Sequence, residues 1–285
     1  MKKSGLMFVL WLLSLAGGTA QVTLQLSLEQ EQFLPGEILP LAVRIVNRSG
    51  QTINLGGDND WLKFTVESRD VPVVVRTGEP PVAEDIVLDS AHAAIKEVNI
   101  APYFNLKKPG HYTVSATAML KDWNRQISSA PISFDIVNAA SLREIEFGVP
   151  LPAGVSNRPP EVRKYVLLQA NYLKKLMLYF QLSEPTGKHD KVYTLGQMLN
   201  MNLQDTQLDR LSNLHVLYQV GAHTSSYVMI NPDGELMKRQ TYEFTTRPRL
   251  RIEDDGRVVV VAAARVERPN DLPVSLPEKA EPVRP

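Results

Sequence analysis

The sequence predicts an all-β fold with two β-rich domains, and three observations support this prediction. Apolar and polar residues alternate over many short segments, which is the pattern of half-buried strands. Asn, Asp, Pro and Gly, which favour tight turns, separate these segments. The chain has 285 residues, of which 44% are hydrophobic, so it can form two cores of ordinary domain size. We expect an N-terminal two-sheet Greek-key sandwich followed by a C-terminal β-meander or propeller-like unit.

Residues 1–20 match a secretory signal peptide. Lys2 and Lys3 precede an apolar run, and small residues ending at Ala20 offer a cleavage site. We expect export to the bacterial periplasm or the extracellular space with cleavage after Ala20, and the alternative is an uncleaved N-terminal anchor. No later segment approaches the ~18 consecutive apolar residues of a membrane span, so we expect no span after cleavage.

Charge and cysteine content exclude several classes of function. The chain has 31 Lys and Arg residues and 31 Asp and Glu residues, so it lacks the positive excess that is typical of nucleic-acid binding. It has no Cys, which excludes disulfide scaffolds, thiol nucleophiles, Cys-ligated zinc and iron–sulfur sites. An exported chain without a disulfide fits a bacterial envelope better than an animal extracellular fluid.

Residues 21–138 are predicted to form the sandwich. The segment 22–28 alternates without a fault, and the turn Asn47-Arg48-Ser49-Gly50 ends the strand that follows. Short strands at this spacing, without a helical period between them, are typical of a two-sheet sandwich. The expected strands are residues 22–28, 39–45, 52–55, 62–68, 71–76, 95–100, 111–119 and 132–137.

Three segments of this domain resemble bacterial immunoglobulin-like modules. They are Phe33-x-Pro35-Gly36-Glu37, Val43-x-Ile45-x-Asn47-x-Ser49-Gly50 and Pro109-Gly110-x-Tyr112-x-Val114-x-Ala116. Macroglobulin-type domains and the intracellular proteinase inhibitor sandwich share this rhythm of turns and strands. The resemblance covers residues 22–137 and implies an immunoglobulin-like β-sandwich. Because the shared residues belong to turns and core, it implies little about function.

The second half is predicted to follow a connector. Residues 139–160 contain four prolines between 150 and 160 and are expected to be a Pro-rich connector, either a linker or a packed segment in which Phe147 docks on a neighbour. The β-rich second domain is expected over residues 161–266. Within it, residues 162–182 fit either an amphipathic helix or strands, and the alternation in their second part favours strands. The Pro-rich residues 267–285 are expected to be a disordered tail.

Strands at residues 214–220 and 227–230 are followed by a repeated turn pattern. Ile230-x-x-Asp233-Gly234-x-Leu236 recurs as Ile252-x-x-Asp255-Gly256-x-Val258, which resembles hairpins of bacterial β-propeller repeats. Only two copies are visible, and four blades of about 40 residues would not fit in this domain. The pattern therefore favours a small propeller-like unit or a stacked β-meander.

The sequence contains no established catalytic motif, and we assign no catalytic, cofactor-binding or metal-ligating residue and expect no cofactor. It lacks a Gly-x-Ser-x-Gly elbow, His-Glu-x-x-His, Gly-x-Gly-x-x-Gly and a phosphate loop. His189-Asp190 could suggest a metal-dependent hydrolase, but we interpret it as a solvated loop because His residues are few and scattered. Residues 56–60 offer oxygen ligands for calcium, yet their spacing favours a turn.

Three further features also favour structural roles. His215, in an apolar strand beside Tyr218, is interpreted as a satisfied core or face histidine rather than a catalytic base or a binding contact. Trp61 and Trp123 could stack on a carbohydrate, but packing against the core is favoured. The basic residues between 247 and 251 lie opposite acidic ones, as is typical of a solvated strand edge.

The leading functional hypothesis is an exported, non-enzymatic protein that binds or assembles through its β domains. Its partner would be a protein or an envelope polysaccharide. The alternative is a carbohydrate- or ester-processing hydrolase with the sandwich as an accessory module, and a third hypothesis is protease inhibition by the sandwich. The hydrolase would need two carboxylates brought together by the fold. The candidates are Asp190, Asp205, Asp209 and Glu235.

Overall fold

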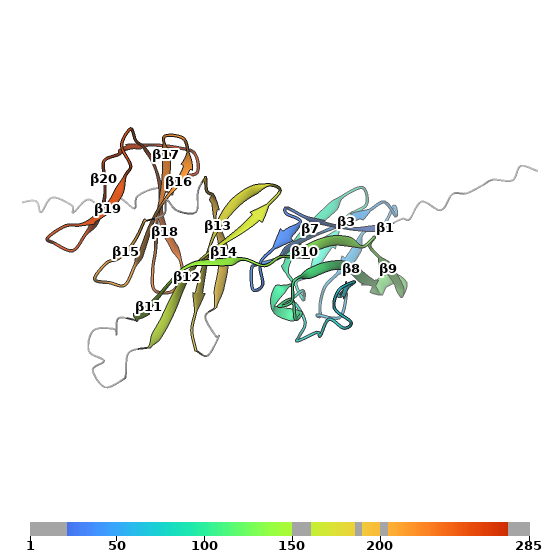
Figure 1. Ribbon diagram of the computed structural model, residues 1–285. Helices are drawn as coiled ribbons and strands as arrows, with labels where there is room; N and C mark the ends of the chain where they lie inside the picture. The colour runs from blue at the N-terminus through green and yellow to red at the C-terminus, as the bar shows by residue number, and fades with distance from the viewer. Residues whose placement is uncertain (1–21, 150–160, 186–189, 200–204, 273–285) are drawn as a thin grey trace, which may run out of the picture.

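The computed structural model describes residues 22–149, 161–185, 190–199 and 205–272, and within these ranges the protein is all-β, as predicted (Figure 1). Its described helices are two short 3-10 turns, η1 (Ala101–Tyr103) and η2 (Lys121–Trp123). In this part of the chain no helix is long and apolar enough to cross a membrane. The signal peptide expected over residues 1–20 lies outside the described residues.

The strands of the N-terminal half are β1 Val22–Leu28, β2 Gln32–Phe33, β3 Pro40–Asn47, β4 Ile53–Leu55, β5 Leu62–Ser68, β6 Ile86–Leu88, β7 Ala93–Asn99, β8 Gly110–Leu120, β9 Arg125–Ser128 and β10 Ile132–Ile136. One sheet has the order β1-β3-β7, and the other has the order β2-β10-β8-β5 with β9 paired to β8. The strands β4 and β6 form a separate pair. Buried side chains from both larger sheets form one core.

Strand β8 shows how the alternating sequence builds this core. Tyr112, Val114 and Ala116 are at most 1% exposed, while the residues between them lie on the opposite face. Phe134 of β10 stacks on Tyr112 with ring centroids 5.6 Å apart, which adds an aromatic contact to the apolar burial. The alternation of apolar and polar residues in the sequence therefore corresponds directly to the buried and outer faces of this sheet.

The strand predicted over residues 71–76 is absent, and this prediction was wrong. Val73 is 72% exposed and Val75 is 54% exposed, so the alternating valines of this segment do not share one buried face. The hydroxyl of Ser68 accepts a hydrogen bond from the backbone N–H of Val71 at 3.1 Å, which turns the chain at the end of β5. Pro72 removes a backbone donor that a paired strand would need.

The strands of the C-terminal half are β11 Ala140–Gly148, β12 Val162–Tyr172, β13 Lys175–Ser183, β14 Lys191–Gln197, β15 Asp205–Leu208, β16 Leu214–Gly221, β17 Thr224–Ile230, β18 Leu236–Glu243, β19 Arg249–Ile252, β20 Val258–Val261 and β21 Ala264–Val266. Two antiparallel sheets follow the chain order, β11-β12-β13-β14 and β15-β16-β17-β18, and β21 completes the second. Their facing side chains share one core, and β19-β20 forms a separate hairpin. Residues 162–182 are strands, as favoured, and both Gly234 and Gly256 have the positive φ expected at their turns.

Two predicted segment boundaries need correction. Residues 140–148, assigned to the connector, form β11, which pairs with β12 and buries Phe147 against Tyr165 at 3.9 Å between ring centroids. The expected disordered tail is ordered up to Leu272, whose N–H donates to the carbonyl of Arg239 at 3.0 Å. The rest of the connector (150–160) and of the tail (273–285) lies outside the described residues.

The two halves contact each other through the turn after β2. Leu34, only 2% exposed, packs with Ala170, Tyr179 and Val192 on the outer face of the β11–β14 sheet. Glu37 forms an isolated parallel bridge with Val192, and its carboxylate accepts a hydrogen bond from the N–H of Leu34 at 2.8 Å. Burial raises the pKa of Glu37, although this hydrogen bond lowers it in part. The junction is therefore a packed contact.

Candidate functional site

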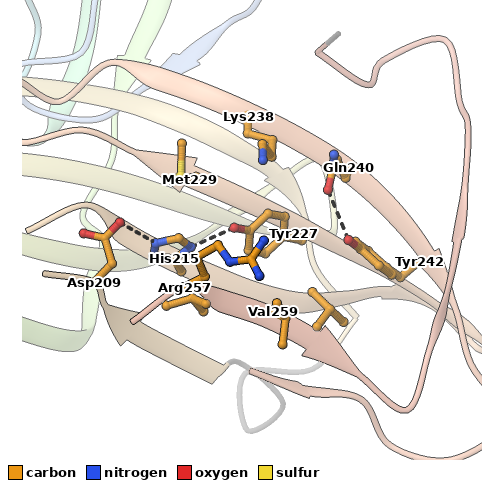
Figure 2. A pocket seen from close by; sticks show the side chains of 11 residues that line it. Asp209, His215, Tyr227, Met229, Lys238, Gln240, Tyr242, Arg257 and Val259 are labelled. Atoms are coloured by element: carbon orange, nitrogen blue, oxygen red, sulfur yellow. Dashed lines mark hydrogen bonds and ion pairs between the residues drawn. The ribbon is translucent and has the colours of Figure 1, made fainter. Parts of the chain in front are cut away.

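A pocket of about 410 Å³, hereafter the outer pocket, lies on the face of the β15–β18 sheet that points away from the core (Figure 2). His215 faces it because its neighbours Leu214 and Val216 point into the core and side chains alternate along β16. The pairing register then places Tyr227 of β17 beside Gln240 of β18 on the same face. The strand β20 of the outer hairpin lines the opposite wall.

A chain of hydrogen bonds joins three side chains at the base of this pocket (Figure 2). The Nδ1 atom of His215 lies 2.7 Å from the hydroxyl of Tyr227, and its Nε2 atom lies 3.2 Å from Oδ2 of Asp209. Both His215 and Tyr227 are buried, at 3% and 4% exposure. A carboxylate only accepts, so Nε2–H donates to Asp209 and Nδ1 accepts from the Tyr227 hydroxyl. A single neutral tautomer of His215 therefore satisfies the hydrogen bonds that link Asp209, His215 and Tyr227.

The turn between β15 and β16 holds Asp209 in place. Its Oδ1 atom accepts hydrogen bonds from the backbone N–H groups of Leu211 and Asn213, both at 2.9 Å. Its Oδ2 atom accepts from the side-chain amide of Asn213 at 2.8 Å as well as from His215. An aspartate that binds the backbone two residues on is the usual device of such a turn. The turn therefore presents the carboxylate to the histidine in one orientation.

The protonation states follow from burial and hydrogen bonding. Burial lowers the pKa of His215 below its ordinary value, although Asp209 partly opposes this effect. Burial alone would raise the pKa of Asp209, but its hydrogen bonds from Asn213, His215 and Leu211 together lower it. Burial also raises the pKa of Tyr227 far above the ordinary value. Near neutral pH Asp209 is therefore a carboxylate, His215 is a neutral imidazole and Tyr227 is a phenol.

The walls of the outer pocket combine polar and apolar side chains. The hydroxyl of Tyr242 donates to Oε1 of Gln240 at 3.1 Å, and the Tyr242 ring meets Tyr227 edge-on with centroids 6.2 Å apart. Lys238 lines the wall and makes no hydrogen bond or ion pair to any described residue. Arg257, in contrast, pairs with Asp255. Lys238 is therefore the cation that a ligand could engage.

This geometry suits binding better than nucleophilic catalysis. A catalytic triad needs a nucleophile whose proton a base can remove. Here the hydroxyl next to His215 belongs to a buried tyrosine with a raised pKa, and both ring nitrogens of His215 are already engaged. The hydrogen bonds among Asp209, His215 and Tyr227 preorganise these side chains, and Lys238 is left as the polar group of the pocket without a partner among the described residues.

The four candidate carboxylates for a hydrolase each have separate partners. Asp205 accepts a hydrogen bond from the N–H of Leu250 at 2.8 Å, and Glu235 accepts from the side chain of Asn231 at 2.9 Å. Asp190 accepts from the backbone N–H of Glu184 at 3.1 Å. Among the four, Asp209 is the one that lines the outer pocket. His189 lies outside the described residues.

The calcium and carbohydrate candidates of the N-terminal half lie in ordinary structural contacts. The carboxylate of Asp58 pairs with Lys121 at 2.6 Å, and Asp60 pairs with Lys63 at 3.1 Å. Trp61 is 1% exposed, and its indole N–H donates to the carbonyl of Val82 at 2.6 Å, so its ring cannot stack on a sugar. Trp123 packs against the same core. Within the described ranges no group of three potential ligands could hold a metal ion.

Sequence reasoning identified His215 as a satisfied, buried histidine, and the structure confirms this. It placed the residue beside Tyr218, which was wrong, because residues three apart on a strand point to opposite faces. Its true partners, Asp209 and Tyr227, were missed. The Asp209-x-x-x-Asn213 turn before the strand and the alternation through Tyr227 are the signals that could have found them. The basic segment after 247 is a mixed-charge edge, in which Arg251 lies 3.8 Å from Glu253.

Comparison with known proteins adds no identification. No family model, no curated protein and no solved structure matches this chain. The fold and the outer pocket are therefore the basis for a functional assignment.

Proposed function

We propose that the protein is an exported, non-enzymatic binding or assembly protein of the bacterial envelope, which takes its ligand in the outer pocket. The observation that carries this proposal is the saturated chain of Asp209, His215 and Tyr227. Groups that already bond each other form a rigid floor for a ligand, and a neutral imidazole with a protonated phenol supplies no nucleophile at neutral pH.

The alternative, a hydrolase, would need an acid and a base carboxylate that face one substrate. Asp190, Asp209 and Glu235 each accept hydrogen bonds from residues close in sequence instead, and Asp205 accepts one from Leu250 of β19. Activity profiling of the purified protein on glycosides and esters separates the two proposals. Turnover above that of a heat-denatured sample would contradict the non-enzymatic assignment.

Capture from envelope extract with matched variants tests the binding proposal. Lys238→Glu reverses the free charge of the outer pocket, whereas Met237→Glu adds the same charge on the same strand at a residue that is 50% exposed. We expect a protein or envelope polysaccharide that is recovered with the wild type and with Met237→Glu and is lost with Lys238→Glu. Equal recovery with all three would contradict a role for this pocket.

A further inference from the structure

Strand β18 also lines a second pocket on the opposite face of its sheet. Arg239 and Thr241 point into it, because they alternate with Lys238 and Gln240 of the outer pocket. This inner pocket has a volume of about 700 Å³ and lies between β18, strand β14 and residues 268–271. It is separate from the outer pocket, so the two sites can be tested independently.

Among the residues that the structure describes, Arg239 has no partner for its charge. Its Nε atom is buried and donates to no acceptor among the described residues, and its guanidinium makes no ion pair with them. Asp271, the carboxylate of this pocket, is already bound by the hydroxyl of Thr241 at 2.8 Å and by the backbone N–H of Arg268 at 3.3 Å. A charged group without a partner is costly to bury, and because Arg239 lines the inner pocket, the terminal nitrogens of its guanidinium can engage an acceptor from a ligand.

We propose that the inner pocket binds the C-terminal carboxylate of an extended peptide, with Arg239 as its bidentate partner. The planar guanidinium matches a carboxylate with two parallel hydrogen bonds. The local charge favours a monoanion. Arg268 is already paired with Glu243 at 2.9 Å, and Asp271 would repel a second negative charge.

The remaining walls favour a peptide over an acidic sugar. The aromatic residue of this pocket, Tyr218, is 2% exposed and its hydroxyl donates to the carbonyl of Leu195 at 2.6 Å, so it offers no ring face for stacking. Val220 and Pro269 supply an apolar lining for a final side chain. β14 is an edge strand of its sheet, beside which an extended chain can lie.

Calorimetric titration of the full chain with a short peptide that ends in leucine tests this assignment. The probe is acetyl-Ala-Val-Leu with a free carboxylate, and its C-terminal amide is the matched control ligand. We expect saturable binding of the acid, and binding of the amide weaker by about tenfold or more, because a charge-assisted pair is lost. Arg239→Met should weaken binding of the acid by a similar factor, whereas Lys164→Met, on β12 at a residue that pairs with Glu144 and lines neither pocket, should leave it unchanged.

Three results would overturn the proposal. They are equal binding of the acid and the amide, equal binding by Arg239→Met and the wild type, and tighter binding of inorganic phosphate or glucuronate than of the peptide. Arg239→Lys keeps the charge but loses the planar fork, so it should bind with intermediate affinity, and it provides the test if Arg239→Met does not fold. Failure here leaves the outer pocket untouched, because Lys238→Glu tests that site separately.

Discussion

At the scale of single residues, His215 links stability to pH. Its pKa is lowered in the folded state, so the unfolded chain binds a proton more readily as the pH falls below about 6.5. We expect the free energy of unfolding to fall as the pH decreases from about 6.5 through the lowered folded value. Asp209, whose pKa is also lowered, should add a second loss at more acidic pH, below about 4. Urea unfolding at a series of pH values measures both steps.

A variant is needed to assign the first step. Glu37 has a raised pKa, so its contribution has the opposite sign: stability is lost as the pH rises from the ordinary value of 4.5 through the raised one. His215→Gln should therefore flatten the slope just below pH 6.5, while Glu37→Gln should remove the opposing contribution that begins at about pH 4.5. An unchanged slope in His215→Gln would show that the pH dependence arises elsewhere.

Replacing Arg163 should also lower the free energy of unfolding. Its side chain is 7% exposed, and it bonds Glu161 at 2.7 Å and Asp233 at 2.9 Å and lies 3.8 Å from the buried Glu184. Arg163→Ala takes the cation away from this acidic surround, and we expect a loss of about 3–5 kcal/mol in the free energy of unfolding. Denaturant unfolding checks this, and Lys164→Ala, which breaks an exposed pair with Glu144, should cost less than about 1 kcal/mol.

At the scale of elements, the turn between β12 and β13 contains avoidable strain. Leu173 and Lys174 both have positive φ, at 46° and 66°, which a two-residue hairpin turn requires and which side chains other than glycine disfavour. Lys174→Gly should raise the free energy of unfolding by about 1 kcal/mol in urea titrations. Lys175→Gly, inside β13, should instead lower it, and a gain in both variants would refute the explanation by strain.

Strand β11 shows what the sequence pattern could and could not predict. Alternation identified most strands of both halves, because one side of each strand faces a core. In β11 the register shifts between Ser141 and Arg143, so Leu142 and Ile145 stand three apart and the period of two is broken. The prolines that follow favour a connector over a strand. In the same way, the contact of His215 with Tyr227 depends on how β16 pairs with β17, whereas the local turn pattern at Asp209 could have identified the other partner.

At the scale of the whole molecule, the junction should couple the two halves. Leu34 is 2% exposed against the β11–β14 sheet, whereas Ile38, nearby in the sequence, is 59% exposed. Leu34→Asp should place a charge in this apolar contact, separate the halves and increase the radius of gyration measured by X-ray scattering. Ile38→Asp should leave the radius unchanged. If Leu34→Asp is also unchanged while folded, the contact does not hold the halves together.

The same contacts bear on proteolysis of the junction. Residues 137–139 are the whole link between β10 and β11, and Arg143 lies within a paired strand. In the wild type we expect trypsin to spare Arg143, because cleavage requires local unfolding. Cleavage at Arg143 in Leu34→Asp but not in Ile38→Asp would show that the docked turn protects the strand.

The two faces of β18 limit which changes in the sequence of this protein can be tolerated. Lys238 and Gln240 serve one cavity while Arg239 and Thr241 serve the other, so both depend on one strand register. A shift of one residue along a strand moves every side chain to the other face. Insertion or deletion of a single residue in the Asn231–Glu235 turn would therefore exchange the chemistry of the two cavities at once, whereas point substitutions change each alone. Related chains should thus conserve the length of this turn more strictly than its composition.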